Sequence, residues 1–276
     1  MLHCRGRELG LERPVVMGVL NVTPDSFSDG GRFLQLDDAV ARGLRMAEEG
    51  AAIIDVGGES TRPGAESVGV EEELQRVIPV IARLRSRTRA IISIDTSKPE
   101  VMHAAAAAGA DMINDVRALR ERGALEAAAV GGCAVCLMHM LGEPRTMQEA
   151  PSYADVVSEV RQFLGARVEA CRAAGLPLER MVLDPGFGFG KTLEHNLELL
   201  RRLRELSVHG LPILAGLSRK SMVGALTGRP AGERAHGSVA LAVVAARNGA
   251  RILRVHDVAA TVDALKVVAA VEGASR

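Results

Sequence analysis

Polar and glycine-rich segments follow each of eight short apolar runs in this chain, and their residue types could do chemistry. Carboxylates such as Asp95 and Asp184 can each accept two parallel hydrogen bonds from neighbouring N–H groups. Lys220 offers a compact cation, and Arg254 offers a planar one that can grip an anion through two hydrogen bonds. His256 follows Arg254 by two residues, so both side chains share one side of an extended segment. One such residue after a strand is often only a helix cap, whereas eight segments together indicate a site.

The apolar runs are typical of strands, and helical periodicity fills the stretches between them. We expect strands near 15–20, 52–56, 90–94, 111–114, 133–138, 181–183, 212–216 and 251–255. We expect helices near 70–87, 97–108, 153–174, 193–207, 234–248 and 257–271. Alternating strands and helices predict parallel βα units, and near-continuous apolar strands predict burial on both faces. Residues 1–276 are therefore predicted to form one α/β domain, a single (β/α)8 TIM barrel, with a doubly wound open sheet as the alternative.

Closure into a barrel would gather the eight polar segments, because barrel enzymes keep their active sites at the carboxyl ends of the strands. The segments 21–31 and 57–64 are long for loops of this kind, which predicts mobile lids. Residues 1–13 are too short for a domain, and their alternating apolar positions predict a hairpin across the opposite end of the barrel.

Composition excludes several other classes of protein. Lys plus Arg equals Asp plus Glu at 34 each, so no global field favours nucleic acid or an anionic membrane. Aromatic residues make up 2% of the chain, too few for the stacking surface of a single-strand-binding protein. No apolar stretch is long enough for a transmembrane helix, and early charges argue against a secretory signal, so we expect a cytoplasmic protein. Cys133 and Cys136 have no second pair at metal-binding spacing, which predicts that they are core residues.

The polar segments resemble the signatures of the dihydropteroate synthase family. The segment 17–31, Met-Gly-Val-Leu-Asn-Val-Thr-Pro-Asp-Ser-Phe-Ser-Asp-Gly-Gly, resembles the first signature, and 55–64, Asp-Val-Gly-Gly-Glu-Ser-Thr-Arg-Pro-Gly, resembles the second. Further matches follow in the family's order: Asp-Thr-Ser-Lys-Pro from Asp95, Ile-Asn-Asp-Val from Ile113, Met-His-Met from Met138, Asp-Pro-Gly-Phe-Gly-Phe-Gly-Lys from Asp184, Gly-Leu-Ser-Arg-Lys-Ser from Gly216 and Arg-Val-His-Asp-Val from Arg254. Motifs of this length in this order are specific, and the match to the family runs from about residue 15 to residue 271.

The resemblance implies a reaction of folate biosynthesis, catalysed by a transferase that forms a C–N bond. A 6-hydroxymethyl-7,8-dihydropterin diphosphate loses pyrophosphate, and the nitrogen of 4-aminobenzoate attacks the exocyclic methylene to give 7,8-dihydropteroate. The implied route is dissociative, through a cation that the pterin stabilises. Mg²⁺ is the implied cofactor and a homodimer the implied assembly, with the helix near 234–248 as a candidate dimer face.

The resemblance also implies roles for particular residues. Asp95, Asp184 and Lys220 are the catalytic candidates, because fixed carboxylates beside the ring would stabilise developing positive charge. Asn21 would bind Mg²⁺ through its oxygen. The residues implied to bind substrate are Thr61, Arg62, Pro63, Asp95, Asn114, Met138, Asp184, Phe189, Gly216, Ser218, Lys220, Arg254 and His256.

Within that set, two subsites are distinguished. Arg254 and His256 would bind the pyrophosphate. Ser218 is expected to open a helix, where free N–H groups favour the carboxylate of 4-aminobenzoate. Phe27 and Phe189 would supply apolar walls. For His139, a role in the site and a supporting role both stay open.

Other functions stay open. A methyltransferase that uses methyltetrahydrofolate could share the pterin pocket, although Asn21 and the segment 218–220 argue against it. A Schiff-base aldolase could use Lys191 or Lys220, but neither lies within an apolar strand, where desolvation would lower its pKa. A protein that binds a pterin without catalysing a reaction is a third alternative, but it would not need polar residues after all eight strands. The segment 186–190 does not match the glycine pattern of dinucleotide-binding loops, which argues against that ligand.

Overall fold

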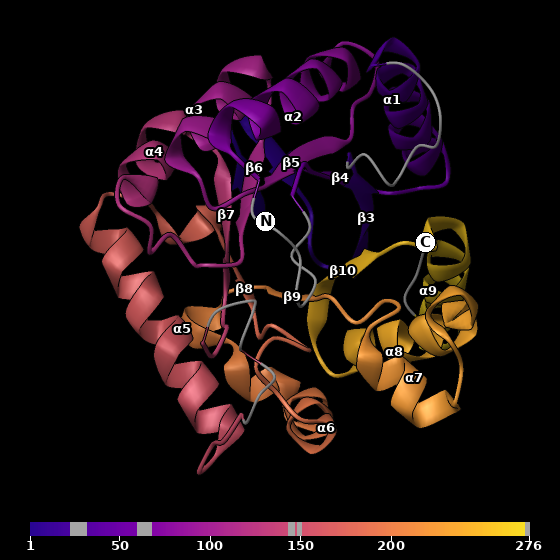
Figure 1. Cartoon of the computed structure of the whole chain (residues 1–276). Helices are drawn as coiled ribbons and strands as arrows, with labels where there is room; N and C mark the ends of the chain where they lie inside the picture. The colour runs from indigo at the N-terminus through magenta and orange to yellow at the C-terminus, as the bar shows by residue number, and fades with distance from the viewer. Residues whose placement is uncertain (23–31, 60–67, 143–146, 148–150, 274–276) are drawn as a thin grey trace.

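The computed structural model contains a closed barrel of eight parallel strands surrounded by helices (Figure 1). It describes residues 1–22, 32–59, 68–142, 147 and 151–273, without the side chains of 32–34. In barrel order the strands are β10 (Ala250–Val255), β3 (Val15–Asn21), β4 (Ile53–Gly57), β5 (Ile91–Asp95), β6 (Met112–Asp115), β7 (Ala134–Met138), β8 (Met181–Asp184) and β9 (Ile213–Ala215). Because β10 pairs with both β9 and β3, the sheet has no free edge. The predicted (β/α)8 barrel is confirmed, and the open sheet is excluded.

Helices separate the strands along the chain and lie outside the barrel (Figure 1). They are α1 (Arg32–Glu48), α2 (Val70–Arg85), α3 (Pro99–Ala108), α4 (Ala124–Gly131), α5 (Val156–Ala173), α6 (Leu193–Arg201), α7 (Ser221–Thr227), α8 (Ala235–Arg247) and α9 (Val258–Val271). The single helix expected at 193–207 is wrong in its second half. The chain leaves helical geometry at Arg202, and short 3₁₀ segments, Leu203–Leu206 and Val208–Gly210, carry it to β9.

A hairpin of β1 (Leu2–Cys4) and β2 (Arg7–Leu9) closes the amino-terminal end of the barrel. Leu2, Cys4 and Leu11 pack in one cluster with the first residues of the barrel strands, such as Met17 and Ile53. Burial of this apolar surface stabilises the amino-terminal end of the barrel. The polar segments follow the carboxyl ends of the strands and therefore lie at the opposite end.

The start of α3 differs from what the sequence suggested. The helix expected from residue 97 begins at Pro99, and its N-cap is Lys98, without a side-chain capping bond. Ser97 instead donates to Asp115, which also accepts from the N–H of Leu119 at 2.7 Å. The hydroxyl therefore ties the end of β5 to the end of β6.

Cys133 and Cys136 are buried and unpaired at β7, as expected for core residues, and burial raises the pKa of Cys133 to about 11. In the described part of the chain, no helix is long and apolar enough to cross a membrane.

Candidate active site

The register of the parallel strands brings the sequence-predicted residues to one height on the rim. Asn21 is level with Gly57, which is level with Asp95, which in turn is level with Asn114. Across the barrel, Met138 at the end of β7 is level with Asp184 at the end of β8. Residues more than a hundred positions apart in the sequence therefore face one opening, because each lies at or next to the carboxyl end of its strand.

Arg254, from β10, links two carboxylates of this rim. Its Nε donates to Oδ2 of Asp55 at 2.6 Å, and its Nη2 donates to Oδ2 of Asp95 at 2.7 Å. Nδ2 of Asn114 donates to the same oxygen of Asp55 at 3.1 Å, which turns the amide oxygen of Asn114 away from Asp55. Burial raises the pKa of Asp95 to about 7, although Arg254 lowers it. Asp55 thus joins Arg254 to Asn114, and Arg254 in turn joins Asp55 to Asp95.

Sequence reasoning missed Asp55 as a member of the site. Its side chain is fully buried, and its second oxygen, Oδ1, has no hydrogen-bond partner among the described residues. The available signal was a charged residue in the middle of the apolar run Ile-Ile-Asp-Val, where an unpaired carboxylate would be very costly. That cost requires a partner, although the sequence alone does not reveal that the partner is Arg254.

Asp184 and Lys220 form the other half of the rim. Oδ1 of Asp184 accepts from the N–H of Gly186 at 2.7 Å, and within the described residues Oδ2 accepts no hydrogen bond. Burial raises the pKa of Asp184, and the nearby charge of Lys220 lowers it. The ammonium of Lys220 donates to the carbonyl of Phe187 and lies 4.6 Å from the ring centre of Phe189. This geometry places a cation between a carboxylate and an aromatic wall.

Gly216, directly after β9, lies between the two halves of the rim. A Cβ at this position would lie 3.8 Å from Nζ of Lys220 and 3.9 Å from Cβ of Arg254. A larger residue here would occupy space beside both cations. Charges on Asp184, Arg254 and Asp95 all act on the pKa of Lys220, and burial, the largest effect, lowers it to about 8. The candidate residues of the two halves therefore converge on one space.

Ser218 and His256 pair directly. The hydroxyl of Ser218 accepts from the backbone N–H of His256 at 3.2 Å and lies 3.0 Å from its Nδ1. The expectation that Ser218 opens a helix is wrong, because α7 begins at Ser221. Arg219 intervenes with a left-handed backbone, φ 59°, and its guanidinium pairs with Asp257 at 2.6 Å. Ser218 is thus held beside the proposed anion-binding histidine rather than at a helix end.

The aromatic and apolar wall comes from β7 and the segment after β8. Met138, Met140 and Met147 form a small buried cluster against which Phe189 packs. The planar ring and the flexible thioethers form a surface on which a flat ligand could lie.

Lys191 and His139 lie behind this wall. Nζ of Lys191 lies 2.9 Å from Nδ1 of His139, and the lysine is only 3% exposed. Burial lowers the pKa of Lys191 to about 7 and that of His139 to about 3. The expectation that Lys191 and Lys220 escape desolvation is therefore wrong, because desolvation lowers the pKa of both. His139 contacts Lys191 and the ring of Phe163, which indicates a supporting role.

Two of the loops carry residues that the structure leaves undescribed. Thr61, Arg62, Pro63 and Phe27 all lie outside the described residues. The start of the second loop is anchored by Glu59, which accepts from Lys98 together with the fully buried Glu73. This carboxylate pair around one lysine was not predicted from the sequence, and it fixes the point where the loop leaves β4.

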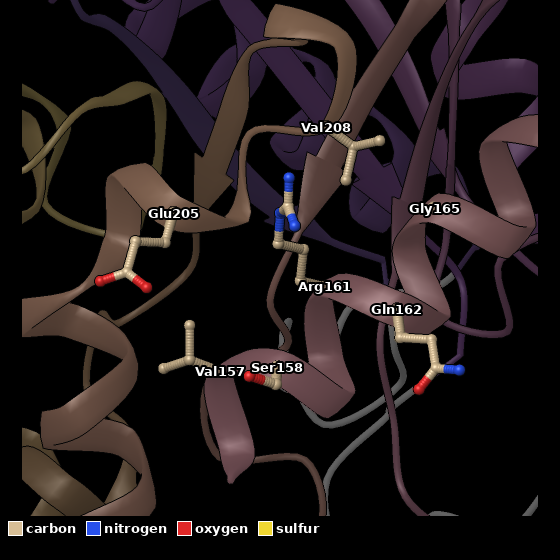
Figure 2. Close-up of a pocket in the computed structure, with 7 residues that line it drawn as sticks. All are labelled: Val157, Ser158, Arg161, Gln162, Gly165, Glu205 and Val208. Atoms are coloured by element: carbon tan, nitrogen blue, oxygen red, sulfur yellow. The ribbon is translucent and has the colours of Figure 1, made fainter.

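The cavity shown in Figure 2 is separate from the rim. It has a volume of about 610 Å³ and lies between α5 and the 3₁₀ segments that precede β9. Its lining residues are Val157, Ser158, Arg161, Gln162, Gly165, Glu205 and Val208. None of the candidate residues lines it, so it does not bear on the site.

Comparisons with known proteins agree with this geometry. A family model described as pterin binding enzyme matches residues 17–256. The chain is 57% identical over 269 residues to dihydropteroate synthase of Escherichia coli strain K12, with 98% of this chain and 95% of that protein covered. Dihydropteroate synthase of Xanthomonas albilineans with 4-aminobenzoic acid matches at a TM-score of 0.93 and 57% identity, covering 99% and 98% of the two chains. A complex of the Xanthomonas albilineans enzyme with 7,8-dihydropteroate matches at a TM-score of 0.90 and 55% identity, with 99% and 98% covered.

Proposed function

The chain belongs to the family of pterin-binding enzymes, and we propose that it catalyses the dihydropteroate synthase reaction. It condenses 6-hydroxymethyl-7,8-dihydropterin diphosphate with 4-aminobenzoate and releases pyrophosphate to give 7,8-dihydropteroate. The single observation that carries the proposal is the convergence of Asp95, Asn114, Asp184 and Lys220 on one rim. Related enzymes in complex with 4-aminobenzoic acid and with 7,8-dihydropteroate support the second substrate and the product.

The pterin is recognised by its hydrogen-bonding edge. Oδ2 of Asp184 and the amide oxygen of Asn114 are acceptors for the ring N–H and amino donors. Lys220 donates to the pterin carbonyl from beside Phe189. A carboxylate, an amide and a cation in this arrangement match the alternating donors and acceptors of the heterocycle.

The diphosphate lies on the side of β10. Arg254 pairs with Asp55 and Asp95 through Nε and Nη2, so its remaining N–H groups can donate to the anion, and His256 is the second residue proposed to bind it. Pairing with two carboxylates holds the guanidinium in one orientation before the substrate arrives, which reduces the entropy lost on binding.

Asn21 is the residue proposed to hold Mg²⁺. A Cβ at Gly57 would lie 3.8 Å from Oδ1 of Asn21 and 3.8 Å from Oδ2 of Asp95, so the missing side chain leaves room between two oxygen donors. Among the described residues no group of three or more His, Cys, Asp or Glu could hold a metal. These oxygens fit an ion that takes most of its ligands from water and phosphate. When bound, Mg²⁺ would supply positive charge to the phosphate oxygens.

The chemical step needs little from a general base. The C–O bond to the exocyclic methylene breaks, and its electron pair leaves with pyrophosphate. Asp95 and Asp184 beside the ring stabilise the positive charge that develops on the pterin. The neutral arylamine then attacks the methylene carbon with its lone pair, and the new C–N bond forms as the nitrogen loses a proton to water. Ser218 and Phe189 orient the 4-aminobenzoate for this attack.

A homodimer and a cytoplasmic location are further parts of the proposal. The dimer would use α8 and α9, where Val244 is 42% exposed and Val267 is 62% exposed. Exposed aliphatic residues on adjacent helices are typical of an interface. Sedimentation of the protein, with Val244→Glu as the disrupting variant, tests this assembly.

The reaction is tested by mixing both substrates with purified protein, with and without Mg²⁺, and measuring dihydropteroate and pyrophosphate. Formation of both products in equal amounts is expected. Methyl transfer from methyltetrahydrofolate without pyrophosphate release would instead support the methyltransferase. Binding of the pterin without turnover would support the binding protein, and trapping of a lysine adduct by borohydride would support the aldolase.

A further inference from the structure

The segment between Asp184 and α6 is held by side chains that donate to its backbone carbonyls. Nζ of Lys191 donates to the carbonyl of Gly186 at 3.0 Å and to that of Phe189 at 2.9 Å. The same nitrogen lies 2.9 Å from Nδ1 of His139. One ammonium group therefore connects both ends of the turn 186–189 to the segment after β7.

Lys220 and Tyr153 also donate to carbonyls within this segment. The ammonium of Lys220 donates to the carbonyl of Phe187, and the hydroxyl of Tyr153 donates to that of Gly190 at 2.8 Å. Lys220 is the proposed pterin-binding cation, so its position depends on where the carbonyl of Phe187 lies.

Glycines let the segment lie directly against the neighbouring backbone. Gly186 and Gly190 have φ of 68° and 64°. A Cβ at Gly186 would lie 1.9 Å from the carbonyl oxygen of His139, and one at Gly190 would lie 2.6 Å from that of Leu141. This close approach brings Lys191 within reach of His139 and covers the ammonium.

We propose that Lys191 is a positioning residue, which fixes the carbonyl of Phe187 and the ring of Phe189 so that the ammonium of Lys220 faces the pterin. A buried ammonium is a costly way to hold a loop unless several acceptors surround it. Here the acceptors of Lys191 are the carbonyls of Gly186 and Phe189 and a ring nitrogen of His139. Phe187 and Phe189 belong to the same turn, and both contact Lys220. The ammonium of Lys191 is itself buried against groups of the protein.

The inference rests on the proposed function, because it assigns the consequence of Lys191 to pterin binding. The test is calorimetry with two probes, 6-hydroxymethyl pterin and inorganic pyrophosphate, on wild type and Lys191→Met. Since a displaced Lys220 would lose its charge-assisted hydrogen bond to the pterin, we expect pterin affinity to fall by about 10- to 100-fold. Affinity for pyrophosphate should not change, because Arg254 and His256 belong to β10 and the residue that follows it, outside the segment that Lys191 holds. Equal pterin affinity in both proteins would overturn the proposal, as would equal losses for both probes.

A spectroscopic readout is independent of any ligand. Tyr153 is the only tyrosine in the chain, and there is no tryptophan. Burial raises the pKa of its phenol, whose hydroxyl bonds to Gly190. Release of the segment in Lys191→Met should let Tyr153 ionise at lower pH, as seen in the ultraviolet absorbance of tyrosinate. If the titration is unchanged while pterin binding is weakened, Lys191 does not act on Lys220 through this segment, and the proposal is contradicted.

Two controls separate positioning from stability. Leu164→Ala removes a fully buried side chain of α5 and should lower the melting temperature without changing pterin affinity or the Tyr153 titration.

Should Lys191→Met fail to fold, His139 provides the second test. His139→Leu removes the acceptor and should weaken pterin binding, whereas His139→Asn keeps an acceptor and should restore it. Wild-type affinity in His139→Leu would reject the proposal. If wild type itself binds no pterin, the proposed function fails instead.

Discussion

Oδ2 of Asp55 accepts a hydrogen bond from Nε of Arg254 at 2.6 Å, across 199 residues of sequence. The same oxygen accepts from Asn114, so one buried carboxylate orients two residues that we assign to different parts of the substrate. Asp55 does not need to touch the substrate to affect both parts.

Asp55→Asn should weaken binding of the pterin diphosphate and lower stability. The amide oxygen can replace Oδ2 as an acceptor, but the negative charge that pairs with Arg254 is lost, and breaking a buried ion pair costs about 3–5 kcal/mol. Chemical denaturation and calorimetry measure the two effects. Asp37→Asn, which removes the exposed pair with Arg83, should cost about 1 kcal/mol at most. Similar losses in the two variants would show that Asp55 has no special role.

Asp184→Asn should abolish pterin diphosphate binding and leave the fold intact. Its Oδ1 can still accept from Gly186, but the second position now presents an N–H to the donors of the pterin. Calorimetry measures the affinity, and circular dichroism monitors the fold. Near wild-type affinity would defeat the assignment of Asp184.

Arg254→Ala should weaken binding of the diphosphate substrate far more than binding of 6-hydroxymethyl pterin. Removal of the guanidinium takes away the anion donors and also leaves Asp55 and Asp95 unpaired. Arg254→Lys, which keeps a charge, should recover part of the difference. If the two ligands lose affinity equally, Arg254 does not bind the anion.

Pterin affinity should fall as pH rises through about 8, because burial lowers the pKa of Lys220 to about that value. The unfolded chain keeps this proton up to the ordinary pKa of 10.5, so Lys220 itself favours the folded state increasingly between about 8 and 10.5. Affinity and this contribution to stability therefore change in opposite directions. Lys220→Arg stays charged, so calorimetry should show no alkaline loss. Persistence of the loss in that variant would assign it to another group.

Gly186→Ala should destabilise the protein more than Gly175→Ala. Both glycines have positive φ, 68° and 87°, which costs an alanine about 1–2 kcal/mol. Only at Gly186 would the Cβ collide with backbone, since nothing lies within 4 Å at Gly175. The difference in unfolding free energy measures the close approach to His139. Equal destabilisation would mean that the segment can move away without cost.

The barrel and most of its rim were predictable because both follow from local patterns. Apolar runs identified the strands, and the residue that ends each parallel strand must face the carboxyl rim, as Asp95 and Asp184 do. Contacts between distant segments were not predictable. The sequence does not reveal that Asp55 meets Arg254, or that Lys191 is covered by the segment of His139.

Local errors had local causes. The position of Ser218 was mistaken because Arg219 adopts a left-handed conformation, which a sequence pattern of Ser-Arg-Lys does not indicate. The long helix expected before β9 ends early at Arg202, although no proline or glycine marks the break.

Closure of the barrel through β10 has a consequence for the order in which the protein becomes active during synthesis. Asp55 is made early and Arg254 late, and β3 has no partner on one side until β10 emerges. A nascent chain that lacks β10 would carry a buried carboxylate without its guanidinium and an exposed strand edge able to pair with other chains. Such a chain could fold in part, yet it would have no complete binding site until its final strand left the ribosome.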